Sequence, residues 1–196
     1  HSWTGNLVTN ADWSAFWLNE GFTMFLERRI TGRLRGEPYR HFDACLGLTD
    51  LRKDIVDQFG VDHPATALCP DMTDMDPDDA YSRVPYEKGH TFLFYLESIV
   101  NKDCQSGDDL GPFGAYLRSY FDRFANKSVS VSEWREDFMS WFKTNYPAIH
   151  QRLSEQVDFE KWLFGCGMPP VIPDYDRSLC HKCEHFANLY HFFVII

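Results

Sequence analysis

A series of amphipathic segments restricts the fold of this chain more than any other feature. In residues 13–34, Phe16, Trp17 and Phe25 belong to an apolar set that recurs with the period of an α-helix, about 3.6 residues. The same periodicity predicts further helices at residues 38–60, 86–101, 113–124 and 134–146. No segment alternates apolar and polar residues convincingly enough to predict a strand. The sequence therefore predicts a mostly α fold.

Local signals mark the limits of several segments. Gly5 is expected to stop a helix that ends within the first residues. Ser130 and Glu133 have the spacing of a capping box, in which each side chain satisfies an unpaired N–H group at the start of a helix. Residues 61–85 form a long connection with several prolines and the acidic run DMTDMDPDD. Because connections of this length in a compact domain are usually functional or disordered, we expect a functional role here.

Composition narrows the class of protein. The chain has 196 residues and a mass of 23.0 kDa, which corresponds to one domain, or one domain and a tail. Its net charge of −10 offers no basic stripe for a phosphate backbone, so no nucleic-acid partner is expected. The negative net charge favours binding of a metal cation or a basic peptide. The alternative is that it only keeps the protein soluble. No apolar run approaches the ~20 residues that span a bilayer, so no membrane partner is expected.

The cysteines indicate a compartment and raise a question about the end of the chain. Six cysteines occur without the regular spacing of a disulfide framework, so we expect reduced thiols and a cytoplasmic location. Residues 177–196 lack helix-capping residues and are expected to form a divergent tail, not a new domain. Potential metal ligands in this tail are Cys180, His181, Cys183, His185 and His191. A second zinc site and an unstructured or alternative C-terminus both stay open, although the spacing fits no standard zinc finger.

Two glutamates in the first long helix share one face. Glu20 and Glu27 are separated by two helical turns, which puts their carboxylates on the same side and ~10 Å apart along the axis. Glu20 follows Leu18 in a largely apolar stretch, where burying a carboxylate is costly unless it binds a cation or a donor. The alternative is a surface glutamate beside a hydrophobic face.

Three ordered motifs carry a family resemblance. HSWTGNLVTN, FWLNEGFTMFLER and DPDDAYSRVPYEKG resemble the M1 family of zinc aminopeptidases, and within it the leukotriene A4 hydrolase branch, with aminopeptidase B as a relative. The resemblance covers residues 1–176. It implies that this segment is the C-terminal half of a thermolysin-like zinc metallopeptidase catalytic domain.

The resemblance implies roles for three residues in a zinc site. His1 corresponds to the second histidine of the family motif His-Glu-x-x-His, and Glu20 to the third zinc ligand. A catalytic zinc takes three protein ligands and leaves one position for water, and two histidines with one glutamate are such a set. Glu27 resembles a carboxylate that orients a ligating histidine. Alternatively, Glu27 pairs with Arg28 or Arg29 in solvent.

The acidic loop and the helix after it carry the other implied site residues. Tyr86, in PYEKG, matches the family tyrosine whose hydroxyl stabilises the tetrahedral oxyanion. Tyr81 matches a tyrosine that lines the substrate pocket. Asp78 resembles an aspartate that recognises a basic side chain of the peptide and positions water in epoxide hydrolysis. The neighbouring aspartates are expected to be solvated.

The implied function is the removal of N-terminal residues from peptides by zinc-activated water, with opening of a lipid epoxide as a further activity. The first histidine and the general-base glutamate of His-Glu-x-x-His would precede residue 1. The remaining domains of a parent chain are therefore expected partners, and this polypeptide alone is expected to be inactive and to bind zinc weakly. The alternative is a non-catalytic helical fragment or binding module from a truncated gene product.

Overall fold

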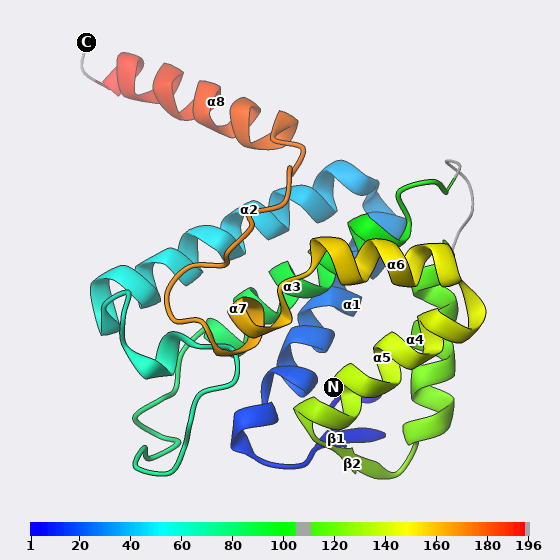
Figure 1. The fold of residues 1–196 in the computed structure, drawn as a ribbon. Helices are drawn as coiled ribbons and strands as arrows, with labels where there is room; N and C mark the ends of the chain where they lie inside the picture. The colour runs from blue at the N-terminus through cyan, green and yellow to red at the C-terminus, as the bar shows by residue number, and fades with distance from the viewer. Residues whose placement is uncertain (105–110, 195–196) are drawn as a thin grey trace.

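A computed structural model describes residues 1–104 and 111–194, with side chains described as far as residue 187. The described α-helices are α1 (Trp17–Arg35), α2 (Glu37–Lys53), α3 (Gly89–Val100), α4 (Gly111–Phe124), α5 (Val131–Asn145), α6 (Pro147–Gln156), α7 (Phe159–Phe164) and α8 (Ser178–Val194) (Figure 1). The short elements are β1 (Val8–Asn10), η1 (Trp13–Ala15), η2 (Asp54–Phe59), η3 (Pro64–Thr66), η4 (Val84–Lys88) and β2 (Lys127–Val129). The predicted mostly α fold is confirmed.

Helix α1 is the centre of the arrangement, because it packs against α2, α3 and the turn η4 (Figure 1). Helices α4, α5 and α6 follow one another around the other side of α3, and α6 packs back onto α3. The capping box predicted before α5 is present. The Ser130 hydroxyl accepts from the Glu133 N–H at 3.3 Å, and the Glu133 carboxylate accepts from the Ser130 N–H at 2.8 Å.

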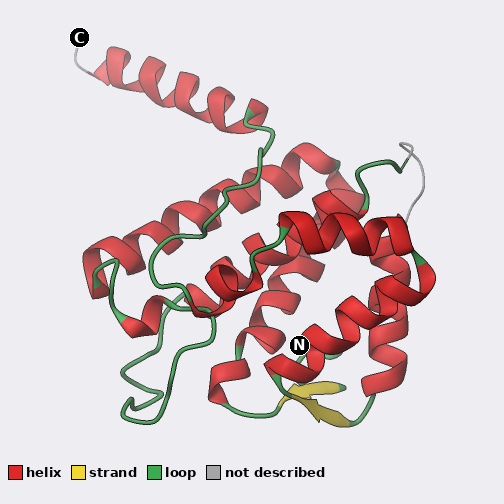
Figure 2. Cartoon of the chain, in the orientation of Figure 1, coloured by secondary structure: helices red, strands yellow, loops and turns green. Residues whose placement is uncertain are grey.

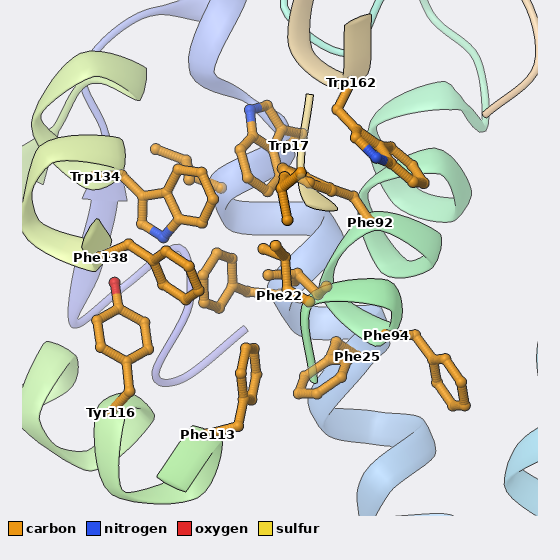
Figure 3. Packing of buried hydrophobic residues seen from close by; sticks show 14 of the residues in the cluster. Trp17, Phe22, Phe25, Phe92, Phe94, Phe113, Tyr116, Trp134, Phe138 and Trp162 are labelled. Atoms are coloured by element: carbon orange, nitrogen blue, oxygen red, sulfur yellow. The ribbon is translucent and has the colours of Figure 1, made fainter. Parts of the chain in front are cut away.

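Aromatic side chains join these helices into one core (Figure 3). Trp17 of α1 meets the edge of Trp134 of α5, with ring centroids 4.9 Å apart. Phe92 of α3 stacks on Trp162 of α7 at 4.7 Å. Offset and edge-to-face ring pairs of this kind stabilise a core beyond their buried area. The apolar face of α1 is therefore fixed in the centre of the molecule, and with it the carboxylates on that helix.

A small sheet was not anticipated. Strands β1 and β2 pair in parallel, with Val8 opposite Lys127 (Figure 2, yellow). Three residues per strand are too few to produce a recognisable alternation. The first residues form turns and not the end of a helix, so that expectation was wrong. The pairing ties the N-terminal segment to the start of α5.

The end of the chain forms a helix that the sequence pattern did not predict. Residues 178–194 form α8, which starts against α2 and extends away from the other helices (Figure 1). The Asp176 carboxylate accepts from the Ser178 N–H at 2.8 Å, a capping contact that the sequence pattern had not revealed. Among the described residues, no helix is long and apolar enough to cross a membrane.

Candidate active site

The first candidate metal ligands meet at the start of α1. Nε2 of His1 lies 2.7 Å from Oε2 of Glu20, within hydrogen-bonding distance. The two residues come from different elements, and the hydroxyls of Thr4 and Thr23, 2.5 Å apart, make a parallel link between the same segments. Glu20 is only 7% exposed, whereas the His1 side chain is 60% exposed. The structure therefore brings the two predicted ligands together, with one buried and one open to solvent.

The environment of Glu20 disfavours an isolated negative charge. Burial raises the pKa of Glu20, and the positive amino group at the N-terminus opposes this shift. A carboxylate in this position is stabilised by a cation or a hydrogen-bond donor, and His1 supplies the donor. The same requirement suits a metal ion.

Imidazole nitrogen and carboxylate oxygen are both ordinary zinc donors, so His1 and Glu20 fit two positions of a zinc site. No group of three or more His, Cys, Asp or Glu side chains suitable for a metal occurs in the part of the chain that the structure describes. The described residues therefore supply two candidate zinc ligands and not three. The described thiols and imidazoles of α8 form no such group either, and the side chain of His191 lies outside the described residues.

Tyr86 is carried by the π-helical turn η4, beside the start of α1. Its ring packs edge-to-face on Phe16, with centroids 6.2 Å apart. Burial, followed by the charge of Glu20 and the hydroxyl of Tyr81, raises the pKa of Tyr86 to about 12. The phenol consequently keeps its proton at neutral pH and remains a hydrogen-bond donor.

Four of the predicted site residues line one open hollow. His1, Glu20, Glu27 and Tyr86 all contribute to its wall. Glu27 is exposed at the surface of α1, two turns from Glu20 as its spacing predicts. Both arginines named as its alternative partners contact other carboxylates. Arg28 is paired with Glu87, and Arg29 with Glu97.

Asp78 and Tyr81 lie beside a second, apolar pocket of about 210 Å³. Its other lining residues include Trp13, Phe16, Leu68, Met72 and Pro77. Phe16 belongs to this pocket and also contacts Tyr86, so the pocket and the hollow adjoin. Tyr81 is 71% exposed, and Asp78 is exposed as well. The predicted substrate-binding residues therefore occupy the rim of an apolar pocket next to the predicted metal ligands.

Close contact between two glycines sets the distance between α1 and the turn that carries Tyr86. A Cβ atom on Gly21 would lie 2.8 Å from the Gly89 Cα and 3.1 Å from the Pro85 carbonyl oxygen. Real Cβ atoms do not approach so closely, so both positions require glycine. Gly21 directly follows Glu20, and Gly89 ends the motif of Tyr86. The contact therefore holds Glu20 and Tyr86 at a fixed spacing.

A buried ion pair fixes the same turn from its other side. Arg28 of α1 donates to both carboxylate oxygens of Glu87, at 2.7 and 3.0 Å. A Cβ atom on Gly47 of α2 would collide with this pair, at 2.0 Å from Glu87 Oε2. Bidentate pairing of this kind adds directional precision to its energy. Sequence reasoning missed the pair, although a glutamate next to Tyr86 in an apolar helix was a usable signal.

Lys88 anchors the end of the turn. Its fully buried ammonium group donates three hydrogen bonds, each 2.8 Å long, to the carbonyl oxygens of Thr66, Gly165 and Gly167. Burial lowers the pKa of Lys88 to about 8, so the amine is still charged at neutral pH and uses all three protons. One side chain thus joins the turn of Tyr86 to two distant loops. Sequence reasoning had given Lys88 no role.

The fold is mostly helical, and it places His1, Glu20 and Tyr86 along one hollow. The peptidase family M1 domain matches residues 1–159, more than half of the chain. The chain therefore belongs to peptidase family M1, a family of enzymes. This confirms the family resemblance in the sequence motifs.

The chain is similar to members of the leukotriene A4 hydrolase branch, as the sequence motifs predicted. The chain is 45% identical over 179 residues to leucine aminopeptidase 2 of Ajellomyces capsulatus. The aligned residues make up 91% of this chain and 27% of that relative. It is 45% identical over 183 residues to leukotriene A-4 hydrolase of Xenopus laevis, with coverages of 93% and 28%. Native leukotriene A4 hydrolase from Saccharomyces cerevisiae superposes with a TM-score of 0.83 at 41% identity, over 95% of this chain and 28% of that one. The chain thus spans little more than a quarter of the curated relatives it matches.

Proposed function

We propose that this chain forms the part of a zinc aminopeptidase catalytic domain that supplies two metal ligands and an oxyanion donor. The observation that carries the proposal is the 2.7 Å approach of His1 Nε2 to Glu20 Oε2, in the hollow that Tyr86 also lines. The substrate is a peptide, whose N-terminal residue is released by hydrolysis. The proposal assigns the parent enzyme to the cytoplasm, where thiols such as Cys69 and Cys166 stay reduced.

His1 and Glu20 hold the metal in this proposal. When bound, zinc lowers the pKa of water and polarises the scissile carbonyl. The 196 residues contain no His-Glu-x-x-His motif. The proposal therefore assigns the remaining histidine ligand and the general base to the rest of the parent enzyme's catalytic domain. Glu27, at the edge of the hollow, orients one of the ligating histidines.

Tyr86 donates its hydroxyl proton in a hydrogen bond to the developing oxyanion. Its raised pKa supports this role, because a phenolate could only accept. The ring contact with Phe16 restricts its direction before substrate arrives. A donor fixed in advance stabilises the transition state without reorganisation during the reaction.

Asp78 recognises a basic side chain of the peptide, and Tyr81 forms part of the pocket wall. Support comes from their position at the rim of the apolar pocket, where Asp78 is exposed and able to meet a cation. The apolar lining of this pocket favours a second candidate function, the hydrolysis of a lipid epoxide. A long acyl chain would fill such a pocket, and Asp78 would position the attacking water.

Zinc binding by the 196-residue chain tests the assignment of the ligands. We expect weak binding in a competition titration with a chromogenic chelator, lost in both His1→Ala and Glu20→Ala. His150→Ala, on α6 and outside both candidate metal sites, is the matched control and should bind as the wild type does. Equal zinc binding by all four proteins would contradict the assignment. No binding by any of them would favour a non-catalytic helical module.

Hydrolysis assays test the catalytic roles. The 196-residue chain alone is expected to give no turnover of arginyl or alanyl amides, because the general base is not among its residues. In the parent enzyme, Tyr86→Phe should lower kcat about 10²–10³-fold with little change in KM, as expected for loss of an oxyanion donor. Robust turnover by the chain alone would overturn the proposal. An assay of the parent on a lipid epoxide decides the second function.

A further inference from the structure

Helix α8 is attached to α2 through a short set of specific contacts. The Asp176 N–H donates to Nδ1 of His41, at 2.8 Å, just before α8 begins. The ring of Tyr175 meets the same imidazole edge-to-face, with centroids 6.0 Å apart. One turn further along α2 is Cys45, and four residues beyond Asp176 is Cys180. The two helices therefore bring these cysteines to the same contact.

The two thiols meet across this contact. Cys180 is buried on α8, and Cys45 is half-buried on α2. Burial, together with a side-chain hydrogen bond to Cys180, raises the pKa of Cys45 to about 11. Because α2 and α8 pack against each other, the two thiols face each other across the interface between the helices. Neither thiol has a part in the proposed active site.

The other described thiols are placed differently, and Cys104 follows the end of α3. Cys69 is buried in the main hydrophobic core, and Cys166 lies on the loop after α7. Cys183 is three residues beyond Cys180 on the same helix, and it is exposed. Cys183 is thus both a rival partner for Cys180 and a matched control.

We propose that Cys45 and Cys180 are an oxidation site, at which a hydroperoxide converts the two thiols into a disulfide that locks α8 onto α2. In the first step a thiolate attacks the O–O bond, forming a sulfenic acid and releasing an alcohol, or water from hydrogen peroxide. In the second step the other thiolate attacks the sulfenic sulfur, the S–S bond forms, and water leaves. Two thiols and one hydroperoxide give one disulfide, one water and one alcohol.

The surroundings of the pair determine when it reacts. Because the thiolate is the reactive form, the raised pKa of Cys45 makes oxidation slow at neutral pH and faster in alkaline solution. The consequence of oxidation is local. Before it, α8 is held by contacts such as that of His41 with the Asp176 N–H, and afterwards also by a covalent bond.

Peptide mapping of the oxidised 196-residue chain tests this inference. The wild type is treated with hydrogen peroxide at pH 7 and pH 9, alkylated, digested and analysed by mass spectrometry without reduction. We expect a cross-link between the Cys45 and Cys180 peptides, formed faster at pH 9 and reversed by dithiothreitol. Cys183→Ser should keep the cross-link, whereas Cys45→Ser and Cys180→Ser should lose it.

A second measurement does not depend on the folding of variants. Phenylarsine oxide bridges two neighbouring thiols, so the reduced wild type should bind it and thereby protect Cys45 and Cys180 from alkylation. A Cys180–Cys183 disulfide as the main product would overturn the inference. The same conclusion follows if the wild type forms no intramolecular disulfide, or if arsenical binding leaves Cys45 fully open to alkylation.

Discussion

The candidate active site has a buried side and an exposed side, and the two are organised differently. Glu20 and Tyr86 are on elements fixed by glycine contact, by the Arg28–Glu87 pair and by the core. On the exposed side, Asp78 is in a turn where its own N–H donates to the Asp76 carboxylate. The position of the buried residues thus depends on tertiary packing, and that of Asp78 on local backbone bonds.

This difference implies that the buried residues determine the stability of the fold and the exposed residues determine which substrate is recognised. A residue such as Glu87 can be changed only at the cost of the packing around it, because its partner would be left charged and buried. A residue on the exposed side can vary with little cost to the fold, because water replaces its contacts. Substrate preference is therefore expected to vary on the exposed side, and the geometry of the chemistry to be held on the buried side.

The largest effect is expected from breaking the buried ion pair. Arg28→Met leaves the Glu87 carboxylate buried without a partner, which should lower the free energy of unfolding by about 3–5 kcal/mol. Urea denaturation of the 196-residue chain measures it. Arg135→Met is the control, since Arg135 and Glu160 form an exposed pair worth at most about 1 kcal/mol. If the two variants lost equal amounts of unfolding free energy, the buried pair would be no more important for stability than the exposed pair.

A smaller effect is expected at the crossing of α1 with the turn of Tyr86. Gly21→Ala should cost about 1–3 kcal/mol, because its methyl group has no room against the Gly89 backbone. Gly32→Ala, in the same helix, is the matched control. Its nearest neighbour is the end of the Glu37 side chain, which can move away, and alanine favours the helix. The contact argument fails if Gly21→Ala unfolds at the same urea concentration as Gly32→Ala.

A local, pH-dependent effect is expected where α8 meets α2. Burial, and then the charge of Arg40, lower the pKa of His41, while the carboxylates of Glu37 and Asp176 oppose the shift. Between pH 6.5 and the lowered pKa the unfolded state binds more protons than the folded state, so stability falls as the pH drops through this window and the loss is complete below the lowered pKa. Protonation also removes the acceptor of the Asp176 N–H.

Hydrogen exchange at pH 7 and pH 5 measures this loosening of α8. We expect faster exchange of the Asp176 amide at the lower pH, after correction for the intrinsic rate. His41→Gln, which cannot be protonated in this range, should remove the pH dependence. Unchanged protection in the wild type would exclude a pH-sensitive contact.

The smallest effect on stability is expected at the exposed side of the site. Asp78→Asn and Glu27→Gln should each change the free energy of unfolding by no more than about 0.5 kcal/mol. In the parent enzyme, Asp78→Asn should raise KM for arginyl amides more than for alanyl amides, because it removes a charge that attracts the basic side chain. A large loss of stability in either variant would show that these residues help to hold the fold.

Much of the fold was predictable because the apolar residues of an amphipathic helix recur in the sequence with the period of the helix. The apolar set containing Phe16, Trp17 and Phe25 predicted α1, and Ser130 with Glu133 predicted the start of α5. Strand β1 was missed because its pairing with β2 joins residues more than a hundred positions apart. Helix α8 was missed because its capping contact comes from Asp176, two residues before the helix starts.

For the candidate site, the sequence by itself determined the residue types and the family, through motifs that put Glu20 and Tyr86 at recognisable positions. Only the tertiary structure decided how these residues are held. The closeness of Gly21 to Gly89, the pairing of Arg28 with Glu87 and the three carbonyls around Lys88 join segments far apart in the chain. Such contacts have no local period, because their geometry exists only after the helices have packed.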